Sequence, residues 1–316
     1  MHSPDSAFVA ELARWGPGGG APAPGLREAE AYCRRLARTH YENFPIASCL
    51  LPRRLHQPFF NVYAYCRWAD DLGDELGDPA RSLAALDWWR QELNACYSGH
   101  GQARHPVFVA LAPTVRQFGI PRQPFEDLIQ AFEQDQRITD YETFPQLLDY
   151  CRRSANPVGR IVLYLGEAFN EQNAWWSDAT CTGLQLTNFW QDVARDLDLG
   201  RIYLPREDCS RFGYPREALR ARVTNQAFLD VMRYAVNRAR GFLHCGLALT
   251  GRLPARLGVD VELFGRGGLL VLDRIERSGY RVWDQRPVIR RRDFSKLFAG
   301  VAWRTLVRRS GFLQPK

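Results

Sequence analysis

Acidic side chains recur at helical spacing in the segment 63–75, which makes it a candidate site of chemistry. The positions i, i+3, i+4 and i+7 are occupied by Arg67, Asp70, Asp71 and Asp74. On a helix these residues would form one stripe of a cation and three carboxylates. Neighbouring carboxylates repel one another unless a cation shares them, and Mg²⁺ prefers oxygen ligands. The stripe therefore fits a magnesium site, and the alternative is a solvated acidic helix face.

A second polar stripe follows later in the chain. Its members, at i, i+3, i+7 and i+11, are Gln185, Asn188, Asp192 and Asp196. Leu186, Phe189 and Val193 fall on another face of the same helix. Gly200 can end this helix and leave Arg201 free to donate two hydrogen bonds to a phosphate. Alone, the segment could be a helix C-terminus with solvated acids, but two such stripes, each with a nearby arginine, favour two metal-binding faces.

Two metal-binding faces suit the departure of a diphosphate group. Two or three Mg²⁺ ions would neutralise its charge and make ionisation of the carbon–oxygen bond accessible. The carbocation left behind needs a water-poor pocket with aromatic faces. Candidates for that lining are Phe44, Tyr65, Tyr150, Phe189 and Trp190. Each of these aromatics could equally be ordinary core.

The composition limits the other functions. The net charge of +7 could suit an anionic ligand or a membrane surface, but no basic stripe interleaved with aromatics supports nucleic-acid binding. The eight cysteines form no CxxC pair, which is typical of reduced thiols. We see neither a secretory signal nor an apolar stretch long enough to span a membrane, so we expect a cytoplasmic protein. Peripheral contact with the inner face of the membrane is compatible with this, although the run 290–292 of three arginines could also be a solvated face.

The apolar periodicity predicts an all-α protein. Residues 15–25 are rich in Gly and Pro, so we expect a flexible segment over 1–25 and one helical domain over 26–316. The length leaves one large domain or two modest ones open, but no internal linker divides the chain. Predicted helices cover 26–40, 56–77, 82–97, 106–117, 123–135, 143–168, 171–197, 225–249, 259–278 and 293–308. We expect a break within 143–168, before Pro157.

These motifs resemble those of the squalene/phytoene synthase family, the head-to-head trans-isoprenyl diphosphate synthases, from about His40 to Arg281. They are the run 40–45 (HYENFP), YCR-x-x-DD-x-x-D over 65–74, Tyr150-Cys151, Val158-Gly159, and Q-x-x-N-x-x-x-D-x-x-x-D over 185–196, continued by GR-x-YLP over 200–205. The resemblance implies the all-α isoprenoid synthase fold, a single domain whose helices surround a central active-site cavity.

The resemblance also assigns roles to individual residues. Metal ligands would be Asp70, Asp74, Asn188, Asp192 and Asp196. Catalytic residues would be these four aspartates with Asp71, Tyr150 and Asn156. Substrate-binding residues would be His40, Asn43, Phe44, Arg67, Gln185, Asn188, Gln191, Arg201 and Tyr203. For His56 we expect a helix-capping role rather than a phosphate contact.

Three departures from the common family pattern narrow the prediction. They are Asn43-Phe44-Pro45 in place of Ser-Phe, the SANPVG sequence over 154–159 in place of a small AG-x-VG turn, and Gln191 in place of an arginine. Neutral drift is one explanation. Together they resemble the hopanoid-pathway branch that converts presqualene diphosphate to hydroxysqualene. Loss of a cation at Gln191 would suit one diphosphate rather than two, and Asn156 could orient the water that captures the final cation.

The leading prediction is therefore a magnesium-dependent hydroxysqualene synthase that works alongside other squalene-pathway enzymes. We see no nicotinamide-binding motif, so NADPH is not expected. The closest alternative condenses two farnesyl diphosphates to presqualene diphosphate or squalene, or two geranylgeranyl diphosphates to phytoene. A helical binding protein without catalytic activity is an alternative of another class.

Overall fold

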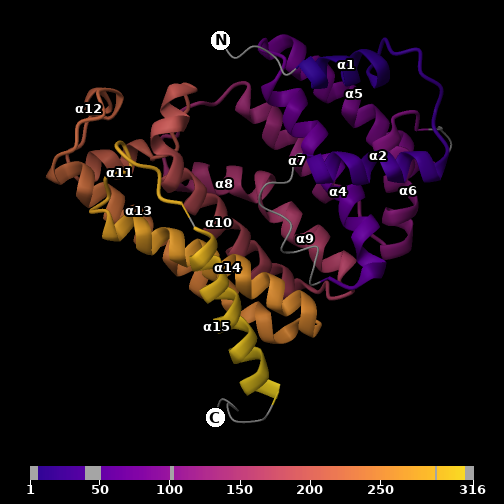
Figure 1. Cartoon of the computed structure of the whole chain (residues 1–316). Coiled ribbons are helices and arrows are strands. Elements are labelled where there is room, and N and C mark those ends of the chain that lie inside the picture. The colour runs from indigo at the N-terminus through magenta and orange to yellow at the C-terminus, as the bar shows by residue number, and fades with distance from the viewer. Residues whose placement is uncertain (1–5, 40–50, 100–102, 289, 310–316) are drawn as a thin grey trace. The chain divides into compact units, whose positions relative to one another are not determined.

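The structure, a computed structural model, describes residues 6–39, 51–99, 103–288 and 290–309. The described residues form helices and no strand, which confirms the all-α prediction (Figure 1). The only β-bridge among the described residues is an isolated one between Asp140 and Ile202. None of the described helices is long and apolar enough to cross a membrane.

The chain divides into two compact units. Unit 1 comprises Met1–Ile138 and Arg160–Glu167, and unit 2 comprises Thr139–Gly159 and Ala168–Lys316. The single domain expected over 26–316 stays a prediction.

Six helices make up most of unit 1. They are α1 (Ser6–Trp15), α2 (Leu26–Thr39), α4 (Arg53–Asp74), α5 (Pro79–Ser98), α6 (Pro106–Phe118) and α7 (Gln123–Asp135). Prolines at the first positions of α5 and α6 fit helix starts, and glycines with positive φ follow both helices. Most of these helices lie within a few residues of their predicted ranges.

Aromatic side chains fill the core of unit 1. Trp68 of α4 stacks on Trp89 of α5, with ring centroids 5.6 Å apart and planes 13° from parallel. His105 lies among these rings, 4.4 Å from the Trp68 ring, and burial lowers its pKa well below the usual value. A neutral imidazole in an aromatic core adds packing area without the cost of burying a charge. This core fixes α4, which carries the first acidic stripe.

The N-terminal helix α1 corrects one expectation. The sequence predicts ordered structure from about Leu26, but residues 6–15 already form a helix. Its Phe8 is buried, and the Phe8 ring lies 5.3 Å from that of Trp68. Trp15, at the other end of α1, lies 6.4 Å from the Tyr32 ring. Two aromatic anchors two turns apart hold a helix that its short periodic pattern did not predict.

Unit 2 contains the longest helix of the described chain. Its elements are α8 (Phe144–Ser154), the first turn of α9 (Asn156–Leu165), α10 (Glu171–Asp198), α11 (Arg206–Arg211), α12 (Arg216–Arg220), α13 (Gln226–Gly246), the 3₁₀ helix η1 (Leu247–Arg252), α14 (Ala255–Arg277) and α15 (Arg291–Arg309). The predicted helix over 143–168 is broken before Pro157, as expected. The short helices α11 and α12 were not predicted, because a pattern of five or six residues shows no clear period.

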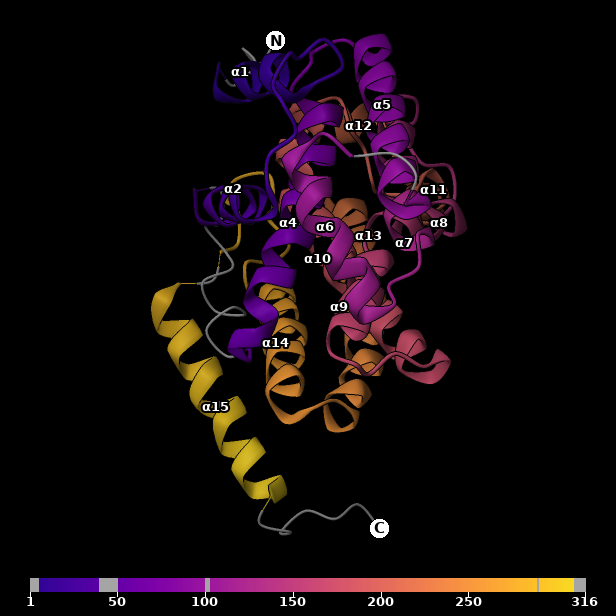
Figure 2. The same cartoon turned by 90° about the vertical axis from the view of Figure 1, so that its right-hand side faces the viewer.

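Glycines allow α10, α13 and α14 to pack closely (Figures 1 and 2). A Cβ atom at Gly246 of α13 would lie 2.1 Å from Thr180 Oγ1 and 2.7 Å from the Thr180 backbone nitrogen of α10. A Cβ at Gly183 of α10 would lie 2.8 Å from two carbons of Leu243. Such approaches are possible only without a side chain. The packing holds α10, which carries the second acidic stripe.

Candidate active site

The first acidic stripe lies on α4 in unit 1, as predicted. Arg67 offsets part of its charge, since Nη2 lies 2.5 Å from Asp71 Oδ1 and Nε donates to Asp71 Oδ2 at 3.1 Å. Arg67 Nη1 lies 3.7 Å from Asp70 Oδ2. Asp71 is buried, whereas Asp70 and Asp74 reach solvent on one face. Asp70 and Asp74 are therefore the pair best exposed to an incoming cation.

Hydrogen bonds on the opposite side of α4 set the direction of the stripe. The Tyr65 hydroxyl donates to the Phe125 carbonyl at 2.8 Å, and Trp68 Nε1 donates to the Tyr32 hydroxyl at 2.9 Å. Tyr65 is thus part of the core, which the sequence left open as the alternative to lining a carbocation pocket. Gln136 donates to the Gly73 carbonyl at 3.0 Å and fixes the end of the stripe.

The second stripe lies on α10 in unit 2. Asn188 is exposed, Gln185, Asp192 and Asp196 are partly exposed, and the intervening Leu186, Phe189 and Val193 are buried. The helix is not regular here, since Asp192 has the non-helical angles φ −107° and ψ 15°. Gly200, with φ +76°, ends the helix as expected, and the Arg201 amide donates to the Asp196 carbonyl at 2.7 Å.

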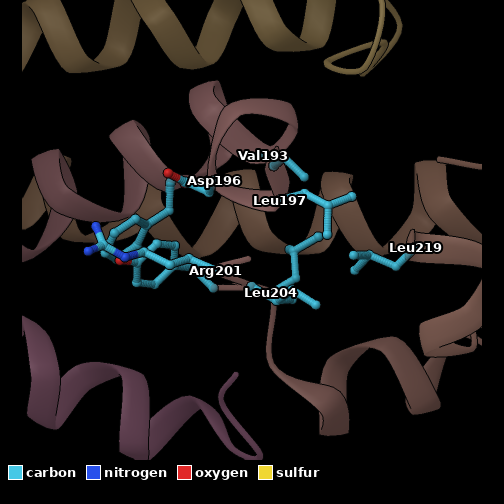
Figure 3. A pocket seen from close by; sticks show the side chains of 9 residues that line it. Val193, Asp196, Leu197, Arg201, Leu204 and Leu219 are labelled. Atoms are coloured by element: carbon cyan, nitrogen blue, oxygen red, sulfur yellow. The ribbon is translucent and has the colours of Figure 1, made fainter. Parts of the chain in front are cut away.

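The surroundings of Asp196 disfavour the charged form of its carboxyl group. Burial and the neighbouring carboxylate of Asp192 raise the pKa of Asp196 to about 7, although Arg201 and Arg286 oppose the shift. A pocket of about 10 Å³, enough for one water molecule, adjoins Asp196. Figure 3 shows the Asp196 and Arg201 side chains at one end of this pocket and Leu204 and Leu219 at the other. A carboxyl so placed is stabilised in its charged form by an added cation.

The structure adds a residue that the sequence did not predict. Arg286 lies between α14 and α15 and forms a two-pronged ion pair with Asp192, with Nε 2.5 Å from Oδ1 and Nη2 2.9 Å from Oδ2. Gln191, which is buried, donates from Nε2 to the Pro287 carbonyl. The Arg286 guanidinium therefore pairs with Asp192 although the two residues are 94 positions apart in the sequence. No local pattern around Arg286 would have shown this.

Aromatic rings pack behind the second stripe. Tyr203 stacks on Phe189 with centroids 3.7 Å apart and planes 10° from parallel. Tyr150 of α8 lies 6.1 Å from Phe189 and 6.0 Å from Tyr203. Tyr141 joins this cluster 5.8 Å from Tyr203. Three of these rings come from positions predicted for the site, whereas Trp190 is fully buried in the core.

Asn156 lies at the break between α8 and α9. It is buried, and its Oδ1 accepts a hydrogen bond from the Thr182 hydroxyl of α10 at 3.0 Å. Gly159 packs tightly against α10, because a Cβ there would lie 2.4 Å from Ser177 Oγ and 2.5 Å from Cys181 Sγ. The first turn of α9 therefore packs against α10, and the Asn156 side-chain amide is buried between the two helices.

The two stripes belong to different units. Among the described residues, no three His, Cys, Asp or Glu side chains lie close enough together to hold a metal ion. Mg²⁺ commonly needs only one or two carboxylates, with water and phosphate oxygens completing its shell. The carboxylate and amide oxygens of each stripe fit that requirement. His40, Asn43 and Phe44 lie outside the described residues, and His56 contacts the Leu51 carbonyl at 3.1 Å.

The chain matches the squalene/phytoene synthase family over residues 37–293. It is 35% identical to a hydroxysqualene synthase of Sinorhizobium fredii over 70% of this chain and 75% of the relative. It is 31% identical to a phytoene synthase of Arthrospira platensis over 81% of this chain and 87% of the relative.

A solved structure is also similar to this chain. The squalene synthase HpnC from Alicyclobacillus acidocaldarius is 43% identical, with a TM-score of 0.77, over 81% of this chain and 95% of that one. The chain therefore belongs to the squalene/phytoene synthase family of head-to-head isoprenoid synthases.

Proposed function

We propose that the protein is a hydroxysqualene synthase that ionises presqualene diphosphate, rearranges the cyclopropylcarbinyl cation and captures it with water. In this proposal Asp70 and Asp74 of unit 1, and Asn188, Asp192 and Asp196 of unit 2, are the residues that would hold Mg²⁺. Two or three such ions would neutralise the charge of the departing diphosphate. Diphosphate departure leaves a carbocation, and attack by water followed by loss of a proton gives the alcohol.

The electrostatics of the second stripe support binding of a metal diphosphate. Burial, followed by repulsion from Asp192, raises the pKa of Asp196. A divalent cation would relieve that repulsion. Arg201, next to the stripe, carries a planar guanidinium suited to phosphate oxygens. Arg286 supplies a further cation, so the lack of an arginine at Gln191 does not by itself favour one diphosphate over two.

The observation that carries the water-capture step is the Asn156–Thr182 hydrogen bond. A buried amide is costly unless it is bonded, and the Asn156 oxygen accepts a hydrogen bond from the Thr182 hydroxyl. Thr182 and Asn188 are six residues apart on α10, about 9 Å along the helix axis. Asn156 thus lies away from the charged end of the site but within the length of a prenyl chain, where it can hold a water molecule by hydrogen bonding.

The names of the relatives support the proposal unevenly. Two hydroxysqualene synthases are 35% and 34% identical to this chain. Phytoene synthases are about 31% identical over a larger share of it. Condensation of two prenyl diphosphates is therefore the alternative that the experiment must separate.

Product analysis with defined substrates tests the proposal. Purified protein incubated with presqualene diphosphate and Mg²⁺, without a nicotinamide cofactor, should form hydroxysqualene. Parallel incubations with farnesyl or geranylgeranyl diphosphate alone should form neither squalene nor phytoene. Untouched presqualene diphosphate would refute the assignment.

Two variants separate a catalyst from a silent binding protein. Asp70→Asn and Asp192→Asn should each abolish product formation while leaving the helical content unchanged. If both variants keep full activity, the carboxylates are not the metal ligands.

A further inference from the structure

The segment 281–288 crosses from α14 towards α15 and is fixed at both ends. We call it the strap. Near its start, the Trp283 ring stacks on Phe228 of α13, with centroids 5.1 Å apart. At its end, the Val288 carbonyl accepts a hydrogen bond from Arg274 Nη1 of α14. The strap is therefore held on unit 2 by contacts outside the acidic stripe.

Two consecutive residues of α10 hold two consecutive residues of the strap. Gln191 donates to the Pro287 carbonyl, and Asp192 accepts from the Arg286 guanidinium. Proline favours an extended residue before it, which keeps Arg286 in a defined backbone conformation. The strap is thus held at this point by one neutral hydrogen bond and one ion pair.

The Gln191–Pro287 hydrogen bond and the Arg286–Asp192 ion pair should respond differently to a divalent cation. A cation at Asp192 would compete with Arg286 for the same carboxylate oxygens, because both are positive. The Gln191–Pro287 hydrogen bond involves neither charge nor a predicted metal ligand, so it can persist. After Arg286 leaves Asp192, the strap would still keep its guanidinium close to the acidic stripe.

We propose that Gln191 is a positioning residue that tethers the strap, so that Arg286 exchanges Asp192 for the diphosphate without leaving the site. This inference rests on the proposed function, since it needs a diphosphate at the second stripe. In this proposal the glutamine acts through Arg286, in place of the direct substrate contact that the family resemblance implies for it.

The tether predicts opposite effects on two ligands. Without Gln191, the Arg286–Asp192 pair loosens, so a metal ion alone meets less competition and binds more tightly. The metal–pyrophosphate complex loses a pre-positioned guanidinium and binds more weakly. A merely structural defect would weaken both.

The experiment measures binding of Mn²⁺ alone and of Mg²⁺ with inorganic pyrophosphate by calorimetry. It compares the full-length wild type with Gln191→Met, Arg286→Met, the double variant and Arg281→Met. Arg281 is an exposed strap arginine and serves as the matched control. Hydrogen exchange of residues 281–288, measured without ligand, reports on the tether directly.

We expect Gln191→Met to weaken Mg²⁺–pyrophosphate binding about five- to tenfold, as for one lost hydrogen bond. Mn²⁺ alone should bind about two- to threefold more tightly, as for a weakened, partly exposed ion pair. The double variant should match Arg286→Met within about twofold, because the two residues act as one unit. Strap exchange should rise in Gln191→Met and stay unchanged in Arg281→Met.

Additive losses in the double variant, or unchanged strap exchange in Gln191→Met, would overturn the inference. So would equal weakening of both ligands. A wild type that does not bind Mg²⁺–pyrophosphate would instead overturn the proposed function, and the assignment of Gln191 with it. A wild type that binds, with Gln191→Met binding equally well, would overturn the inference alone.

Discussion

Asp260 of α14 is a buried carboxyl group whose two oxygens have no hydrogen-bond partner among the described residues. Burial raises its pKa from the ordinary 3.8 to about 8. The folded protein therefore keeps the proton at neutral pH, whereas the unfolded chain releases it above pH 4. Because the unfolded state binds fewer protons between pH 4 and pH 8, the free energy of unfolding falls as pH rises through that window.

Replacing the acid by its neutral isostere should remove this dependence. One unit of pKa difference corresponds to about 1.4 kcal/mol, so Asp260→Asn should gain stability over the wild type by up to about 1.4 kcal/mol per pH unit. Between pH 5 and pH 8 the difference should grow by about 3 to 4 kcal/mol. Near pH 4 the variant should be no more stable than the wild type, because both side chains are then neutral.

Urea unfolding of both proteins, followed by far-ultraviolet circular dichroism at pH 5, 6, 7 and 8, measures this difference. Asp273→Asn is the matched control, because Asp273 lies on the same helix with a partly exposed side chain 3.1 Å from Arg240. Its effect should change little across the window. A stability difference for Asp260→Asn that is flat between pH 5 and pH 8 would show that the wild-type carboxyl is already charged or partnered, and would refute the reasoning.

Three further predictions concern the site and the packing that holds it. Thr182→Val should lower the share of hydroxysqualene among the products from presqualene diphosphate, and Thr182→Ser should restore it, because only the hydroxyl bonds Asn156; unchanged products in the valine variant would remove Asn156 orientation from the mechanism. Gly246→Ala should lower the free energy of unfolding by about 1 to 3 kcal/mol, because the new methyl group meets Thr180. Gly241→Ala, on the same helix with open space around it, should be neutral or stabilising by thermal unfolding. Removing metal with a chelator should abolish turnover, and added Mg²⁺ should restore it; activity in the presence of chelator would contradict metal dependence.

Much of the fold could be predicted from periodicity and breaking residues. The helix carrying Asp192 was predicted over 171–197 and ends before Gly200, whose positive φ suits glycine. The break between α8 and α9 lies at Ala155, and Pro157 indicates it because a proline fits the first turn of a helix but not its interior. Helix α1 was missed, because its stability depends on Phe8 packing against a tryptophan far along the chain. Local pattern predicts local structure, and it carries no information about such partners.

The predicted site shows the same division between local and distant information. The order of residues on each stripe was readable, since helical spacing fixes which carboxylates share a face. Of the two arginines that pair with the stripes, the sequence indicated one. Arg67 lies one turn from Asp71 on the same helix, so its ion pair follows from the spacing. Arg286 comes from beyond the end of α14, and nothing in its own segment indicates the acid that it meets.

Gln191 illustrates why the charge of one residue is an unreliable guide to a site. On the sequence it was interpreted as a missing cation, because the amide is neutral where a guanidinium was expected. In the folded chain the Gln191 amide donates to the Pro287 carbonyl, and the preceding strap residue, Arg286, brings a positive charge to Asp192. The charge beside the stripe therefore depends on the strap as much as on α10. Selectivity for one diphosphate or two should accordingly be sought in the position of Arg286, which Gln191 controls, rather than in the neutrality of Gln191 itself.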